Sequence, residues 1–98
     1  MKVHELKTDP DIYDAELAEQ KPWMLRINDR DFKVGDIVHS RKTKYTGIEM
    51  QEGLPLIYTG EEMLVEITYI QHGPFYTVPE GTVIMAFCFL HSTSEDEY

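Results

Sequence analysis

Two runs of residues indicate the architecture of this chain: His4-Glu-Leu-Lys-Thr-Asp-Pro-Asp-Ile-Tyr-Asp-Ala15 and Arg26-Ile-Asn-Asp-Arg-Asp-Phe-Lys-Val-Gly-Asp36. The first run passes from a short strand, expected over residues 2–7, into a helix, expected over residues 10–20. The second run leaves another strand through a turn rich in Asn and Asp, whose side chains can bond their own backbone. A strand, a helix, a second strand and a turn in close succession predict an α+β chain.

The start of the helix has a physical signature in Asp9-Pro10. The Asp9 carboxylate can accept bonds from the free N–H groups of the first turn, and Pro10 lacks only a donor that would have no partner there. Pro22 ends the helix, because proline cannot continue it. We expect its buried side to consist of Ile12, Tyr13, Ala15 and Leu17.

Further strands are expected at Trp23–Ile27, Ile37–Arg41, Met63–Ile70 and Thr82–Leu90. The alternation of polar and apolar residues in Met63–Ile70 predicts that its odd-numbered residues, from Met63 to Tyr69, face the core. The fourth is nearly all apolar, which is typical of a central strand covered on both faces. We therefore interpret Cys88 as a buried thiol that acts as a small hydrophobe.

The remaining connections carry weaker signals. Residues 42–60 are rich in turn residues and are expected to be irregular, as a functional loop or a mobile insertion, although residues 54–58 could pair or dock. Residues 76–80 are expected to form a short edge. Five or six strands and one early helix predict a small, mixed, partly closed β-barrel.

The composition, with 42 % hydrophobic residues in a chain of 98, fits one folded domain. We place this domain at residues 1–91 and expect the polar, acidic residues 92–98 to be a disordered tail. No apolar run is long enough to span a bilayer, the N-terminal residues lack the apolar core of a secretion signal, and the single cysteine suits a reducing compartment. These features predict a cytoplasmic protein without membrane association.

The net charge of −9 is unevenly distributed. All nine Lys and Arg residues precede Tyr45, together with nine Asp and Glu residues, so the first half is neutral and the second half is acidic. Residues 21–44 carry seven basic and three acidic side chains. This distribution is compatible with a basic patch on an acidic body and equally with charges spread around a barrel in solvent.

The same residues resemble a known family. The His4–Lys7 run, the helix with Tyr13-Asp14-Ala15, and the Asn28–Arg30 and Val34–Asp36 runs are similar to small ASCH proteins of the PUA-like superfamily, often found in bacteria and their phages. The resemblance is dense over about the first 40 residues, weakens over residues 42–62, and returns in the last two expected strands. It implies a PUA-like barrel with a cleft at the end of the helix.

ASCH proteins are thought to bind RNA or nucleotides, and some small members hydrolyse an acylated amino group on modified cytidine. Their motif is Gly-x-Lys-x-x-Glu-x-Arg. Lys21 and Arg26 match it, but Glu19 stands in place of the Gly and Met24 in place of the Glu, or of the Thr of hydrolytic members. The Met24 thioether cannot transfer a proton, so the catalytic motif is incomplete and we expect a binding module. If the chain is an enzyme instead, we expect Lys21 to be the catalytic residue. No cofactor is implied.

The ligand-binding residues that we predict are Lys7, Lys21, Trp23, Arg26, Arg30 and His4. Arg26 could instead pair internally with Asp29 or Glu5, and Trp23 could instead anchor the core. The Asn28–Asp31 cluster is interpreted mainly as a turn, and the four histidines and the lone cysteine have no metal-ligand spacing. Besides RNA or a nucleotide, the acidic second half could engage a basic host protein, and the chain could be a monomer or a weak dimer.

Overall fold

The structure, a computed structural model, describes residues 1–93 and confirms the predicted α+β class with a single mixed sheet. Its elements in chain order are β1 (Val3–Thr8), α1 (Pro10–Leu17), β2 (Trp23–Ile27), β3 (Ile37–Thr43), α2 (Gly47–Gln51), β4 (Tyr58–His72) and β5 (Thr82–Thr93). The last strand thus takes in the first two residues of the tail predicted at 92–98, and the rest of that tail lies outside the described residues.

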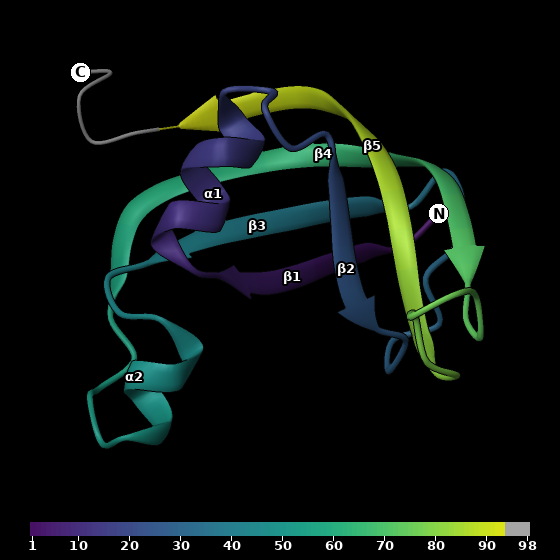
Figure 1. Cartoon of the computed structure of the whole chain (residues 1–98). Coiled ribbons are helices and arrows are strands. Elements are labelled where there is room, and N and C mark those ends of the chain that lie inside the picture. The colour runs from purple at the N-terminus through teal and green to yellow at the C-terminus, as the bar shows by residue number, and fades with distance from the viewer. Residues whose placement is uncertain (94–98) are drawn as a thin grey trace.

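The five strands form one sheet in the order β1-β3-β4-β5-β2. β1 runs parallel to β3, and every other neighbouring pair is antiparallel. The long strands β4 and β5 curve around the molecule, so that the sheet forms a half-barrel with β1 and β2 at its two ends (Figure 1). We call the opening between β1 and β2 the seam.

The core fills the concave side of this half-barrel. It consists of Leu6, Tyr13, Met24, Phe32, Val38, Met63, Val65, Ile67, Val83 and Met85. Helix α1 contributes Tyr13, and Leu17 packs against the core as expected, but the prediction for Ile12 is wrong, because it is 40 % exposed. Glu16 is buried in its place, so a carboxyl group points inward together with Tyr13.

Strand β4 is longer than predicted and changes phase near its middle. Met63, Val65 and Ile67 are buried as expected, but the register against β5 shifts between Ile67 and Tyr69. Such a bulge moves the following side chains to opposite faces of the sheet. Tyr69 is consequently 59 % exposed, and the prediction that it faces the core is wrong, while Ile70 packs against the core in its place.

The predicted burial of Cys88 is also wrong, because the thiol is exposed. Strand β5 pairs with β2 only through residues 82–86, and a last backbone bond from Phe87 N reaches Pro22 O. Beyond that point β5 is flanked on one side by β4 alone. The apolar run of its second half, including Phe89 and Leu90, therefore faces solvent and not a second covering layer.

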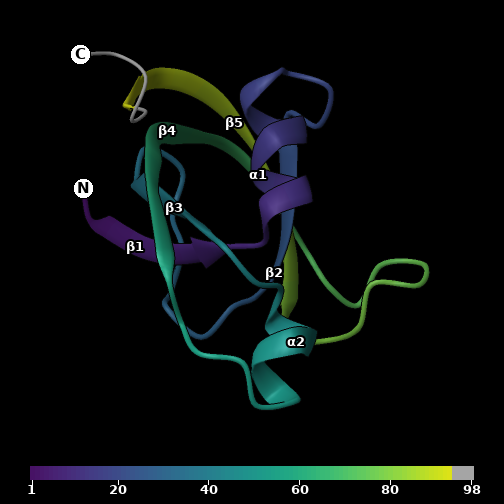
Figure 2. The same cartoon turned by 90° about the vertical axis from the view of Figure 1, so that its left-hand side faces the viewer.

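The connection at residues 42–60 holds a short helix, α2, which the sequence analysis did not predict. A capping box starts it: Glu49 N donates to Thr46 Oγ1 at 3.1 Å, and Thr46 N donates to Glu49 Oε1 at 3.0 Å. Gly47 N also donates to Asp9 Oδ1 at 3.0 Å, which ties α2 to the start of α1. Figure 2 shows α2 at the lower end of the molecule, below α1. In place of the short edge strand expected at residues 76–80, the structure has an isolated β-bridge between Phe75 and Val78.

Neither helix of the described residues is long or apolar enough to cross a membrane.

Candidate functional site

A cavity of about 350 Å³ lies where α1, β2 and the end of β1 meet. The chain positions it through the turn that follows α1. Gln20 N and Lys21 N both bond back to Ala15 O, and Glu19 adopts a positive φ of 60°, so the chain reverses before β2 begins. The cavity is lined by Lys7, Thr8, Asp9, Ile12, Glu16, Lys21, Trp23, Met24, Leu25 and Arg26.

Lys21 is held at this reversal by three contacts. Its Nζ lies 3.0 Å from Glu16 Oε2, 2.7 Å from Trp23 O and 4.3 Å from the centroid of the Trp23 ring. An ammonium over an indole face is a favourable cation–π arrangement. The amine is thus fixed at the wall of the cavity between a carboxylate and an aromatic ring.

Glu16 is the residue of this site that the sequence analysis missed. Its side chain is 1 % exposed, and its Oε1 has no hydrogen-bond partner among the described residues. Burial raises the pKa of Glu16, while the hydrogen bond and charge of Lys21, and the more distant charge of Arg26, act in the opposite direction. Its spacing from Tyr13, three residues along a helix, was the signal that could have placed it on the inward face.

Arg26 extends from β2 across the seam to β1. Its Nη1 donates to Lys7 O at 3.4 Å, and its Nη2 donates to Thr8 Oγ1 at 3.3 Å. Burial lowers the pKa of Arg26, and the negative charge of Glu16 partly compensates. No carboxylate of residues 1–93 lies within ion-pair distance of this guanidinium.

The internal partners considered for Arg26 are instead paired elsewhere. Glu5 Oε1 lies 2.9 Å from Arg41 Nη1, and Asp29 Oδ1 lies 3.8 Å from Arg30 Nε. The reading of Arg26 as half of an internal ion pair is therefore wrong for the described residues.

Trp23 is 44 % exposed, so the alternative that it anchors the core is wrong. Strand β2 alternates, and it is Met24 that faces inward, with 1 % exposure, opposite Met85 of β5. The indole stays at the mouth of the cavity, where one of its faces carries the Lys21 ammonium.

A second cavity, also of about 350 Å³, continues along the seam. It shares Lys7, Leu25 and Arg26 with the first cavity. Arg30 lines it and donates from Nη1 to Glu5 O of β1 at 3.1 Å. The structure therefore brings Lys7, Lys21, Trp23 and Arg26 to the first cavity and places Arg30 in the second.

His4 is the predicted site residue that lines neither cavity. It is 6 % exposed, its ring packs 4.7 Å from the Phe32 ring, and its Nε2 donates to Asp36 Oδ2 at 2.8 Å. Asp36 also accepts from Lys2 N at 3.0 Å and from Lys33 N at 3.1 Å. The bond from His4, followed by the two backbone bonds, lowers the pKa of Asp36 to about 2. His4 is thus part of a hydrogen-bond network around Asp36 that joins β1 to the loop before β3.

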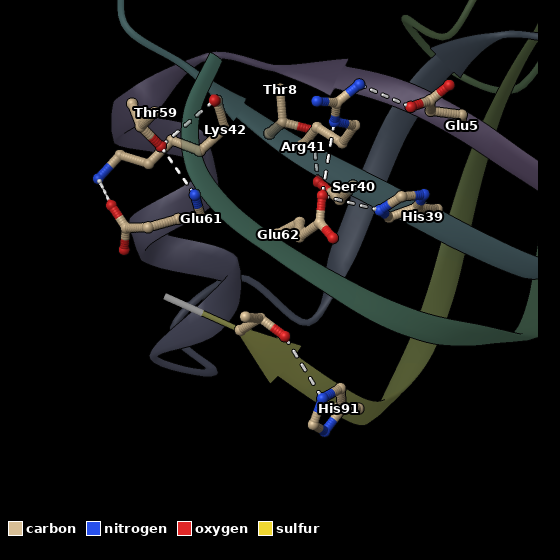
Figure 3. A network of polar contacts seen from close by, with 11 residues as sticks. Glu5, Thr8, His39, Ser40, Arg41, Lys42, Thr59, Glu61, Glu62 and His91 are labelled. Carbon is tan, nitrogen blue, oxygen red and sulfur yellow. Dashed lines mark hydrogen bonds and ion pairs between the residues drawn. The ribbon is translucent and has the colours of Figure 1, made fainter. Parts of the chain in front are cut away.

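Two carboxylates of the acidic half are paired with the basic residues of β3 (Figure 3). Glu62 Oε2 lies 3.5 Å from Arg41 Nε and 3.2 Å from His39 Nε2, and Glu61 Oε2 lies 3.1 Å from Lys42 Nζ. The hydrogen bond that Lys42 Nζ donates to Asp14 raises the pKa of Lys42. These pairs neutralise part of the acidic surface that was considered for a protein partner.

The described residues contain no group of three or more His, Cys, Asp or Glu side chains placed to hold a metal ion.

Fold and site together define a small α+β half-barrel protein with a cavity beside its open seam that is lined by three basic and two acidic side chains. The chain belongs to the family described as a domain of unknown function, DUF3850, which matches residues 3–87. The match spans β1 to the middle of β5 and includes both cavities. A search of curated proteins found no match.

Proposed function

We propose that this protein binds RNA or a nucleotide in the cavity between α1 and β2. The observation that carries the proposal is the meeting of the Lys21 ammonium, the exposed Trp23 indole and the Arg26 guanidinium in one cavity. Nucleic acids require both elements, because cations bind the phosphates and aromatic rings stack on the bases.

The dimensions and charges of the site support the same ligand class. Its volume of about 350 Å³ lies within the range of about 300–1,000 Å³ that is typical of small-molecule sites. Arg26 has unused donors in a planar fork that matches a phosphate group. The resemblance to ASCH proteins, which we retain as a prediction, points to the same class of ligand.

Intrinsic fluorescence offers a direct test, because Trp23 is the single tryptophan of the chain. Titration with nucleoside monophosphates and short single-stranded RNA should give saturable quenching, with an affinity that falls steeply as salt increases. The double variant Lys21→Ala plus Arg26→Ala should lose this binding. The variant Lys44→Ala, which removes an exposed lysine outside both cavities, is the control and should bind as the wild type does. Binding that survives the double variant would contradict the site assignment.

A second candidate is an amidohydrolase acting on acylated cytidine, and one observation favours it. Glu16 supplies a buried carboxyl group, with a raised pKa and a free oxygen, next to Lys21. This group takes the place of the acid that Met24 cannot provide. In amide hydrolysis, Glu16 would accept a proton from the attacking water and pass it to the leaving amine, so that the products are a carboxylate and a free amino group.

Assay of N4-acylated cytidine distinguishes the two candidates. The amidohydrolase candidate predicts turnover by the wild-type protein that is abolished in Glu16→Gln. Absence of wild-type turnover, together with activity gained in Met24→Glu, would instead identify a binding protein on a fold capable of catalysis.

A further inference from the structure

The two cavities of the seam share one wall, and this wall is positively charged. Each cavity has a volume of about 350 Å³, and Lys7, Leu25 and Arg26 line both. Within residues 1–93, strands β1 and β2 are not paired with one another through their backbones, so the seam is spanned by side chains. The cavities are therefore two compartments of one groove.

Arg26 at the shared wall is a cation with capacity for another ligand. Its two bonds to β1 are long, at 3.3 and 3.4 Å, and a guanidinium has five N–H donors. Neither Arg26 nor Lys7 forms an ion pair with a carboxylate of the described residues. An anion located between the compartments would meet Arg26, and Lys7 lines both compartments beside it.

The compartments on either side offer different contacts to a base. The first is lined by the Trp23 indole, on which a base can stack, and by Glu16, whose buried Oε1 has no partner among the described residues. The second presents the exposed Ile27 and the Arg30 guanidinium, whose plane can stack on a base. Each compartment thus has a surface for one base, and the Arg26 guanidinium lies between the two compartments.

We propose that the seam binds single-stranded nucleic acid as a unit of two nucleotides, with the phosphodiester that joins them at Lys7 and Arg26. This inference rests on the proposed nucleotide-binding function and specifies its ligand. An acidic peptide fits less well, because Glu16 and Asp29 in the walls would repel its carboxylates, whereas a phosphodiester carries its charge only at the link.

The test compares ligands of increasing length by Trp23 fluorescence and by calorimetry. The ligands are nucleosides, their 5′- and 3′-monophosphates, dinucleoside monophosphates and trinucleotides, in ribo and deoxyribo forms. The dinucleoside monophosphate should bind about tenfold or more tightly than either mononucleotide, and the trinucleotide should add little. A methylphosphonate link, which removes the charge, should lose most of this gain. Stronger binding of the ribo form would identify RNA as the strand.

Two variants separate the compartments. Arg30→Ala should weaken dinucleotide binding about fivefold or more and weaken mononucleotide binding much less, because the first compartment can still hold a single base. Lys33→Ala removes an exposed basic residue of the same loop that lines neither cavity, and it should bind both ligands as the wild type does. Thermal unfolding of each variant verifies that it is folded.

Equal affinities for mononucleotide and dinucleotide would overturn the two-nucleotide unit and leave the proposed function intact. Saturable binding of an acidic peptide, without binding of any nucleotide, would overturn both. Unchanged dinucleotide affinity in folded Arg30→Ala would overturn the role of the second compartment.

Discussion

Asp36 and Glu16 are both buried carboxyl groups beside a basic side chain, but their oxygens have different surroundings. Asp36 accepts three bonds, from His4 Nε2 and from the backbone N–H groups of Lys2 and Lys33, and its pKa falls to about 2. Glu16 accepts one bond from Lys21, and its other oxygen has no partner among the described residues. Its pKa is raised.

The difference separates a structural carboxylate from a candidate functional one. A buried carboxylate whose two oxygens both accept hydrogen bonds stabilises the fold. One with an oxygen that has no donor costs stability, and such groups are typical of functional sites, where a ligand can supply the missing donor. Only Glu16 lines one of the two seam cavities. Replacing each carboxyl group by its amide should therefore cost different amounts of stability, and a fall in pH should change their contributions in opposite directions.

The largest effect is expected for Asp36→Asn. The amide keeps the shape of the carboxyl group but removes its charge and turns one acceptor into a donor that faces other donors. We expect a loss of about 2–3 kcal/mol in the free energy of unfolding, measured by urea denaturation at neutral pH. Asp31→Asn, an exposed carboxylate of the same loop, is the matched control and should change stability by less than about 0.5 kcal/mol. A loss no larger than that of the control would break the comparison.

The effect of Asp36 should depend on pH in a defined direction. Because its folded pKa lies below the ordinary value of 3.8, its contribution to stability is present above that value and is lost as the pH falls through about 2. The stability difference between wild type and Asp36→Asn should be present above about pH 4 and shrink as the pH falls towards 2. Urea midpoints across this range measure it, and a difference that persists at pH 2 would contradict the assignment.

A smaller loss is expected for Lys21→Ala. The substitution leaves the Glu16 carboxylate without its partner, and Lys21 itself is partly exposed. We expect a loss of about 1–2 kcal/mol at neutral pH, most of which should be recovered when Glu16→Gln is added. A double-mutant cycle by urea denaturation measures this coupling. Strictly additive effects would show that the two side chains do not stabilise one another.

The smallest effect on stability is expected for Glu16→Gln, at less than about 0.5 kcal/mol. Its carbonyl can still accept from Lys21, and the buried charge is gone. A raised pKa means that the folded state holds the proton more tightly, so the wild type gains stability as the pH falls from neutral towards 4.5. The variant should lack this slope in the same urea series. A loss as large as that of Asp36→Asn would show that Glu16 is structural.

Much of the sheet could be predicted because it depends on local signals. The bounds of β2 are those expected from its apolar run between Pro22 and Asn28, and the proline-marked start of α1 is correct. α2 was within reach as well, because Thr46-Gly-Ile-Glu49 has the spacing of a capping box. What failed depends on tertiary structure: the bulge that turns Tyr69 outward, and the short β2 that leaves Cys88 uncovered.

The candidate site shows the same division. The resemblance to ASCH proteins pointed to Lys21 and Arg26, and both line the first cavity. Glu16 was missed because apolar side chains alone were assigned to the buried face of α1, whereas burial of a carboxyl group depends on a basic partner that only the reversed chain brings near. The family pattern alone suggested the cleft for His4, and its pairing with Asp36 has no local signal, because the two residues lie 32 positions apart.

The side-chain bridges across the seam have a mechanical consequence. A backbone ladder can change its alignment only in whole register steps, because each step breaks and re-forms a series of bonds. Arg26 and Arg30 reach β1 through flexible side chains, so the ends of the sheet can separate by fractions of a residue without breaking a ladder bond. The separation of β1 and β2 is thus set by side-chain contacts, while backbone ladders fix the spacing of every neighbouring pair of strands in the sheet.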